Sequence, residues 1–288
     1  MEENKMLDYI KEVLENMPPG WVGLTTHRLD IFNENLAKTQ FLSEFQNLFN
    51  DNNSDASALK ELPTAYDYIR LGHPLSCILE WAIAHLNAIN PERVISFSSK
   101  TAPILAVLRK NLLDHKNTQI LYKGELPGFF DADILQRVYG YKFVLKKVDS
   151  LSSISNFNGS TIFISQQDEI STIDLTLPKA AEIDFFITMY TNLGSVLVVN
   201  GKQSENYISD IQHVRRRETI AMTPINSLTA LKSLVDQSSS DPQKNNSDSN
   251  RDKTNKTLVL DSIKEITGTT AKPLVASSGL SIQYAIMM

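Results

Sequence analysis

From about residue 66 to residue 235, hydrophobic positions alternate between helical and strand-like spacing. Apolar residues three and four apart predict helices in CILEWAIAHLNAI, from Cys77, and in APILAVLRKNLL, from Ala102. The same spacing predicts helices in DADILQRVYG, SENYISDIQHVRRRETI and NSLTALKSLV. Short apolar runs predict strands in RVISFSS, TQILY, YKFVLKKV, STIFISQ, DFFITMY and GSVLVVN. The expected fold class is therefore α/β, with three layers and a mostly parallel sheet covered by helices on both faces.

The pattern changes on either side of this region. Helical spacing up to about Met17 ends at PPG, and a second helix is expected from about Asn33 to Phe49. Polar residues with almost no apolar side chain begin at Asp236, which is typical of a flexible linker. Ordered α/β sequence then resumes, and its last helical pattern has no capping residue before Met288. Four regions are predicted: an N-terminal helical segment (1–60), the α/β domain (61–235), a flexible polar linker (236–257) and the truncated start of a second domain (258–288).

Composition excludes several classes of function. The 288 residues are 42% hydrophobic and 21% charged, with a formal net charge of -5, so we expect a soluble protein that does not bind nucleic acid. The basic run Arg215, Arg216 and Arg217 is expected to be a solvated helix face. An acidic N-terminus and the lack of a long apolar run predict neither a signal peptide nor a membrane helix. The single cysteine, Cys77, is expected to pack in the core, in agreement with a cytoplasmic location.

Common nucleotide and metal motifs are missing from the sequence. It contains no G-x-G-x-x-G, no G-x-x-x-x-G-K-[ST] and no cysteine or histidine pair at metal-ligand spacing. The histidines are scattered and are expected to be surface or core residues: His27, His73, His85, His115 and His213. We therefore expect no metal site.

Two serine-containing turns are candidates for phosphate binding. Ser98 and Ser99 follow a predicted strand and precede a helix, where free N–H groups and the helix dipole favour an anion. The alternative is that a serine only caps the helix. Ser277, Ser278 and Gly279 repeat the arrangement, with a glycine that permits close approach of a ligand.

Tyr68 and Arg70 lie two residues apart before the Gly-His-Pro turn. Both side chains could reach one phosphate, the arginine through a forked contact. The alternative is a packed tyrosine beside a surface arginine.

In order, the segments YIRLGHP, ILEWAIAHLN and ISFSSKTAPI resemble the Cys/Met-metabolism family of pyridoxal-phosphate (PLP) enzymes, which includes cystathionine γ-synthase, cystathionine β-lyase and methionine γ-lyase. That family has Y-S-R-x-G-N-P-T, L-E-x-x-[IL]-A-x-L-E and a strand ending in S-S-G-M. The resemblance covers about residues 66–234 and implies a sheet like the large domain of fold-type I PLP enzymes. It implies that Tyr68, Arg70, Ser98 and Ser99 bind the cofactor phosphate and that Tyr122 stacks on its ring.

The sequence departs from the family pattern at three points. Thr191 occupies the position of the Schiff-base lysine, and a hydroxyl cannot form an imine. The segment with the aspartate that pairs with the pyridine nitrogen is missing between Gln167 and Asp184. Lys100 replaces the glycine of S-S-G-M. The domain is therefore expected to be a degenerate copy with no catalytic residue of its own, whereas Ser277, Ser278 and Gly279 are expected to open a more complete second copy.

Three functions follow from these patterns. The first is the N-terminal part of a PLP-dependent lyase or transferase of the trans-sulfuration type, inactive alone, with a sulfur-containing amino acid as substrate and a homo-oligomeric assembly. The second is a non-catalytic pseudo-enzyme domain for dimerisation or regulation. The third is an unrelated α/β binding domain.

Overall fold

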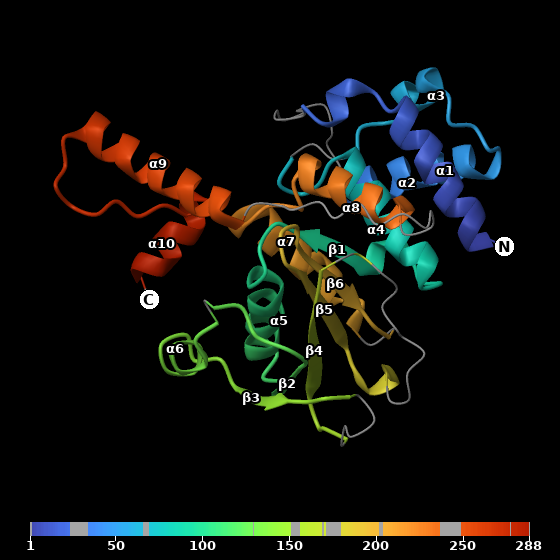
Figure 1. The fold of residues 1–288 in the computed structure, drawn as a ribbon. Coiled ribbons are helices and arrows are strands. Elements are labelled where there is room, and N and C mark those ends of the chain that lie inside the picture. The colour runs from blue at the N-terminus through green and yellow to red at the C-terminus, as the bar shows by residue number, and fades with distance from the viewer. Residues whose placement is uncertain are drawn as a thin grey trace.

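A six-stranded sheet forms the middle layer of the molecule (Figure 1). The structure is a computed structural model that describes residues 2–23, 34–65, 69–128, 130–150, 156–168, 170, 180–201, 204–236, 249–276 and 278–287. Its strands are β1 (Val94–Phe97), β2 (Thr118–Tyr122), β3 (Phe143–Lys147), β4 (Ser160–Gln167), β5 (Phe185–Tyr190) and β6 (Gly194–Val199). They lie in the order β1-β6-β5-β4-β2-β3, and β6 alone runs antiparallel to its two neighbours. The predicted α/β class with a mostly parallel sheet is confirmed.

One face of the sheet is covered by the N-terminal helices. These are α1 (Glu2–Asn16), α2 (Glu34–Asn50), α3 (Ala56–Glu61) and α4 (Pro74–Leu86), together with α8 (Pro224–Asp236). Their shared core is rich in aromatic rings; Trp81 of α4 lies 5.2 Å from Phe45 and 5.3 Å from Phe49, measured between ring centroids. Residues of the predicted 1–60 segment thus share one hydrophobic core with the sheet.

The opposite face is covered by α5 (Ala102–Leu113), α6 (Ala132–Arg137) and α7 (Tyr207–Glu218). Phe97, Phe185 and Tyr207 are fully or almost fully buried there. Every residue of β5 and β6 is buried, because helices cover both faces of these central strands. Short 3-10 helices lie at Pro19–Trp21, Pro91–Arg93 and Ala180–Glu182.

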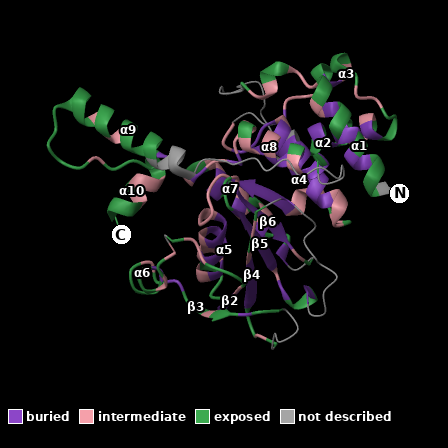
Figure 2. Ribbon diagram, viewed as in Figure 1, coloured by how far each residue is buried: buried purple, intermediate pink, exposed green. Residues whose placement is uncertain are grey.

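The C-terminal helices α9 (Ser249–Thr267) and α10 (Gly279–Met287) extend away from the sheet (Figures 1 and 2). From Thr254 to Thr267, no side chain of α9 is buried. Helix α9 begins inside the predicted linker, so the part of that linker from residue 249 is helical. Within 249–276 and 278–287 the structure has no strand, and the strand expected before Ser277 is wrong: residues 272–276 are irregular.

A cluster of charges lies inside the core, between α2, α4, α7 and β1. Glu80 is fully buried; its Oε2 atom lies 2.6 Å from Lys38 Nζ, and its Oε1 atom lies 2.7 Å from Arg215 Nη1. The backbone N–H and hydroxyl of Ser96 also donate to Glu80 Oε1, at 2.8 and 2.7 Å. The predicted solvated face is therefore wrong for Arg215, which is fully buried, whereas Arg217 is exposed. Arg215 is drawn into the core because Glu80 needs a cationic partner there.

Cys77 is fully buried beside this cluster, as predicted. Burial raises the pKa of its thiol to about 12, so the thiol is protonated at neutral pH. Within the described part of the chain, no helix is long and apolar enough to cross a membrane, and no cluster of His, Cys, Asp or Glu could hold a metal ion.

Candidate functional site

The carboxyl ends of β1, β4 and β5 bring several predicted site residues to one edge of the sheet. Ser98 and Ser99 follow β1, and Thr191 begins the turn after β5. Asp168, which no sequence motif indicated, follows β4. In open α/β sheets, ligands bind outside the carboxyl ends of the parallel strands. This edge is therefore the candidate functional site.

The turn after β1 uses its hydroxyl groups within the chain. Ser99 Oγ accepts hydrogen bonds from the N–H groups of Thr101 and Ala102, at 3.3 and 3.1 Å. Ser98 donates its N–H and its hydroxyl to the carbonyl of Ile220, at 3.1 and 3.3 Å. The carbonyl of Ser99 accepts from Ser195 Oγ at 2.6 Å. Ser99 thus lies before the N-cap residue, Thr101, and its hydroxyl satisfies the first N–H group of α5, which is the structural alternative to phosphate binding.

Thr191 is exposed at the end of β5, and its polar atoms are paired with residues from neighbouring strand ends. Its hydroxyl donates to Asp168 Oδ1 at 2.7 Å. Its carbonyl accepts from Lys100 Nζ, also at 2.7 Å. Partial burial lowers the pKa of the Lys100 amine. The only amine that the described residues place at Thr191 thus comes from Lys100 and is engaged by a backbone carbonyl.

Between β4 and β5 the sheet contains no further strand. Residues Ile162–Gln167 pair directly, in parallel, with residues Phe185–Tyr190. A carboxylate carried by an intervening strand therefore has no place in this sheet. Residues 171–179, in the connection between these strands, lie outside the described residues.

The turn that contains Arg70 and the turn that contains Ser98 are joined by one segment, Ile220 to Met222. The N–H of Ala221 donates to the Arg70 carbonyl at 2.8 Å, next to the carbonyl of Ile220 that accepts from Ser98. The carbonyl of Met222 accepts a 2.7 Å hydrogen bond from His73 Nε2. Backbone contacts therefore bring these two sequence motifs together. Tyr68 lies outside the described residues, so its predicted role stays a prediction.

His73 is the N-cap residue of α4 and has a structural role. Its Nδ1 atom accepts from the N–H of Ser76 at 3.2 Å, and Ser76 Oγ accepts from the N–H of His73 at 2.9 Å. This reciprocal pair is a capping box. Burial lowers the pKa of His73 to about 4, so the ring is neutral at pH 7 and carries its proton on Nε2, the atom that donates to Met222.

Tyr122 lies far from the serine turn. It ends β2, which is separated from β1 by β4, β5 and β6, a distance of about 19 Å across the sheet. Its side chain is half-buried against the core on the α5 and α7 face. The structure therefore does not bring Tyr122 together with Ser98 and Ser99.

The second serine turn is also a helix cap. Ser278 Oγ accepts from the N–H of Ser281, and the N–H of Ser278 donates to Ser281 Oγ, both at 3.1 Å. Gly279 is the first residue of α10, and a Cβ atom at this position would meet no atom within 4 Å. Ser277 lies outside the described residues. With no strand before it, this turn differs from the one after β1.

Sequence reasoning missed the partners of Glu80. The apolar helix pattern around it contained a clue, because a carboxylate surrounded by buried positions requires a buried cation. The cations are Lys38 and Arg215, which come from helices far away in the sequence. The basic run 215–217 predicts a surface position for Arg215, and this prediction is wrong.

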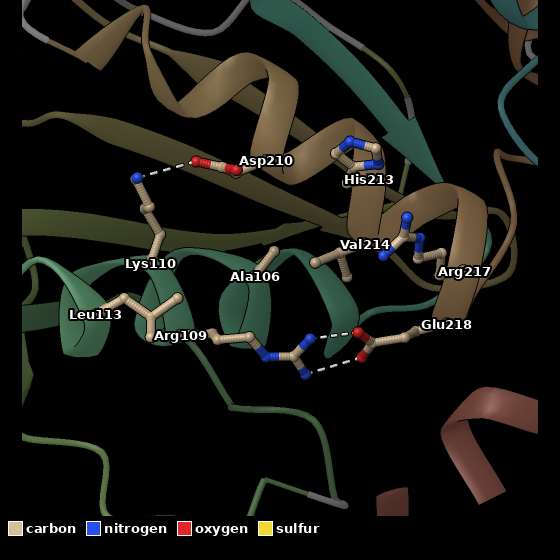
Figure 3. A pocket seen from close by; sticks show the side chains of 9 residues that line it. All are labelled: Ala106, Arg109, Lys110, Leu113, Asp210, His213, Val214, Arg217 and Glu218. Carbon is tan, nitrogen blue, oxygen red and sulfur yellow. Dashed lines mark hydrogen bonds and ion pairs between the residues drawn. The ribbon is translucent and has the colours of Figure 1, made fainter. Parts of the chain in front are cut away.

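A hollow opens between α5 and α7. Figure 3 shows Arg109 of α5 reaching Glu218 of α7. The Nη1 and Nη2 atoms of the guanidinium group both pair with the carboxylate, and Nη2 lies 2.8 Å from Glu218 Oε2. Nearby, Lys110 Nζ pairs with Asp210 Oδ2 at 3.0 Å. The hollow has a volume of about 220 Å³. These ion pairs hold α5 and α7 side by side.

No protein-family model matches this chain, and no curated protein matches its sequence. Solved structures that are similar to it include metB from Corynebacterium glutamicum, with 15% identity over 62% of this chain and 55% of that chain and a TM-score of 0.40. Cystathionine gamma-lyase from Lactobacillus plantarum, complexed with L-serine, has 14% identity over 60% and 54% of the two chains and a TM-score of 0.39. A putative O-acetylhomoserine (thiol)-lyase from Campylobacter jejuni has 13% identity over 74% and 64% and a TM-score of 0.39. At these identities and TM-scores, the function of this chain has to be argued from its own residues.

Proposed function

We propose that this chain is a non-catalytic domain built on a sheet of the PLP-transferase type, and that it serves as a platform for association with a second copy of itself. The observation that carries the proposal is Thr191. It stands at the end of β5 where the resembled family has the Schiff-base lysine, and its hydroxyl is bonded to Asp168. A hydroxyl cannot form an imine with an aldehyde.

The phosphate of PLP finds few free donors at this edge. The N–H groups of Thr101 and Ala102 donate to Ser99 Oγ, and the Ser98 hydroxyl donates to Ile220. A helix N-terminus binds an anion through N–H groups that no other acceptor uses. Two N–H groups and one hydroxyl of this turn are therefore already used within the chain, which disfavours a cofactor phosphate here.

The pyridine nitrogen of PLP also lacks a partner strand. The direct pairing of β4 with β5 leaves no strand for the carboxylate that would keep this nitrogen protonated. Without that carboxylate the ring is a poor electron sink. Two requirements of the cofactor, the amine that forms the imine and the partner of the pyridine nitrogen, are thus unmet.

A second candidate is that the chain is the N-terminal part of a PLP-dependent trans-sulfuration enzyme that is inactive alone. The backbone contacts that join Arg70 and Ser98 through Ile220 and Ala221 favour it, because they bring two motif-like segments of the resembled family together. In this alternative, the substrate is a sulfur-containing amino acid, the assembly is a homo-oligomer in the cytoplasm, and another part of the assembly supplies the missing amine.

The test is to add PLP to the full chain, record the visible absorption of an imine, reduce with borohydride and locate adducts by mass spectrometry. We expect no saturable imine band and only scattered, substoichiometric adducts, equal to those on the urea-unfolded chain. Lys100→Ala is the matched control, since it removes the amine that the described residues place at Thr191. We expect it to behave like the unchanged chain.

One adduct per chain at Lys100, absent from Lys100→Ala, would contradict the non-catalytic proposal. Light scattering after gel filtration tests the second half of the proposal, with a mass of two chains expected. The mass of a single chain at all concentrations would contradict the proposed association. It would not affect the proposal that the chain does not use the cofactor.

A further inference from the structure

The proposed function makes no use of a cavity bounded by α5, α6, α7 and α10. Its volume of about 460 Å³ lies within the usual range of small-molecule sites. Its lining includes Ser98, Ser99 and Thr101 of the serine turn. Further along α5 it includes Arg109, Tyr139, Tyr141, Glu218 and Tyr284. Arg109 lies eight residues after Thr101 in α5, about 12 Å along the helix axis, so these residues extend the cavity away from the serine turn.

Tyr284 of α10 places its ring in this cavity. The ring centroid lies 5.1 Å from the guanidinium carbon of Arg109, a cation-π contact. It also lies 5.7 Å from the ring centroid of Tyr139, with the planes tilted by 47°. Tyr139 in turn stacks on Tyr141 at 5.9 Å, with the planes within 16° of parallel. One aromatic ring is thus held by a planar cation on one side and an aromatic ring on another.

The pocket that receives this ring is built from the body of the protein. Glu218 pairs with two nitrogens of Arg109, fixes the guanidinium plane and raises the arginine pKa (Figure 3). Tyr141 is buried, and burial raises its pKa to about 12, so its hydroxyl stays protonated. The Nε atom of Arg109 is buried, and Tyr141 interacts with the same guanidinium group.

Helix α10 itself is only lightly attached. None of its residues is buried, and Leu280, Ile286 and Met287 are 46%, 73% and 84% exposed. It packs on α7, and α9 before it has no buried side chain between Thr254 and Thr267. The Tyr284 ring therefore covers Arg109 and Tyr139 from a lightly attached helix, and Ser281 and Ala285 of the same helix also line the cavity.

We propose that the pocket formed by Arg109, Tyr139 and Tyr141 is a binding site for small molecules with a hydroxylated aromatic ring, and that Tyr284 is its built-in competing occupant. The expected ligand resembles the side chain of Tyr284: it has a planar aromatic ring with one hydroxyl group. The ring packs against the Arg109 guanidinium and against a second aromatic ring. A molecule of this class displaces α10 when it binds.

The experiment uses the full chain and p-cresol, the ring system of tyrosine, as the probe. Isothermal titration calorimetry is expected to show that Tyr284→Ala binds p-cresol about tenfold more tightly than the unchanged chain, because the competitor is gone. Ile286→Ala is the matched control on the same helix, and its affinity is expected to be unchanged. Arg109→Lys, combined with Tyr284→Ala, is expected to lose most of the gain, because an ammonium has no planar face.

Equal affinity of the unchanged chain and Tyr284→Ala for p-cresol would overturn the competing role of Tyr284. Toluene binding as tightly as p-cresol would overturn the requirement for a hydroxyl group. Unfolding midpoints are measured in parallel, and we expect those of Tyr284→Ala and Ile286→Ala to agree with that of the unchanged chain, since neither residue belongs to the buried core. These results are independent of PLP, so they can fail without affecting the proposed function.

Discussion

Glu80 lies fully buried in α4 between a lysine from α2 and an arginine from α7. Burial alone would raise its pKa, but the two cations overcome this and lower it from the ordinary 4.5 to about 2. A carboxyl group whose pKa is lower in the folded state stabilises the fold above its unfolded pKa. The contribution, about 3 kcal/mol, is therefore present above about pH 4.5 and is lost as the pH falls toward 2.

The first prediction concerns this residue. Glu80→Gln should lower the free energy of unfolding by about 3 to 5 kcal/mol at pH 7, because Lys38 and Arg215 remain buried without a counter-charge. It should also flatten the fall in stability between pH 5 and pH 3. Urea unfolding across this pH range measures both effects. Arg217→Gln, in the exposed part of the same basic run, is the control and should change stability by less than about 0.5 kcal/mol.

At the scale of elements, β6 approaches the end of β1 very closely. Gly194 begins β6 with φ +127°, and a Cβ atom there would lie 2.1 Å from the carbonyl oxygen of Phe97. Only glycine fits this conformation without strain or a clash. The junction of these two strands also positions Ser195, which donates to Ser99.

The second prediction follows from this junction. Gly194→Ala should destabilise the protein by about 2 to 4 kcal/mol, because the clashing atom is backbone and cannot move aside easily. Gly128→Ala, at an exposed position where a Cβ atom meets nothing within 4 Å, should stay within about 0.5 kcal/mol of the unchanged chain. Equal unfolding midpoints for the two variants would contradict the close approach.

The elements themselves could largely be predicted from the sequence, because they depend on local spacing. Ala102–Leu113, for example, has the boundaries that its apolar pattern indicates. The pairing of Glu80 with Arg215 could not be predicted from the sequence, because α4 and α7 come together only in the folded chain. Ser99 and Ser278 show the same limit, because a serine before a helix caps the helix or binds an anion according to which N–H groups remain free.

At the scale of the whole molecule, we expect the stability of the fold to be nearly independent of the C-terminal helices. Both hydrophobic cores are made of residues up to Val235. Figure 2 shows α9 and α10 as mostly exposed or half-exposed, outside these cores. The arm formed by α9 and α10 therefore adds little buried apolar surface to the fold.

The third prediction is that a chain ending after Asp236 keeps the unfolding free energy of the full chain to within about 1 kcal/mol, the size of an exposed cation-π contact. Chemical denaturation of the two chains under the same conditions measures the difference. A loss of several kcal/mol would show that α9 and α10 contribute to the core in a way that their exposure does not indicate.

The position of β6 between β1 and β5 has a consequence for synthesis of the chain on the ribosome. In the sheet, β1 pairs only with β6, so Val94 has no strand partner until Val198 has been synthesised. Until that point, an apolar strand edge stays unpaired while most of the domain is being made. The nascent chain therefore reaches its native sheet late, and the need for protection by chaperones is greatest before β6 emerges.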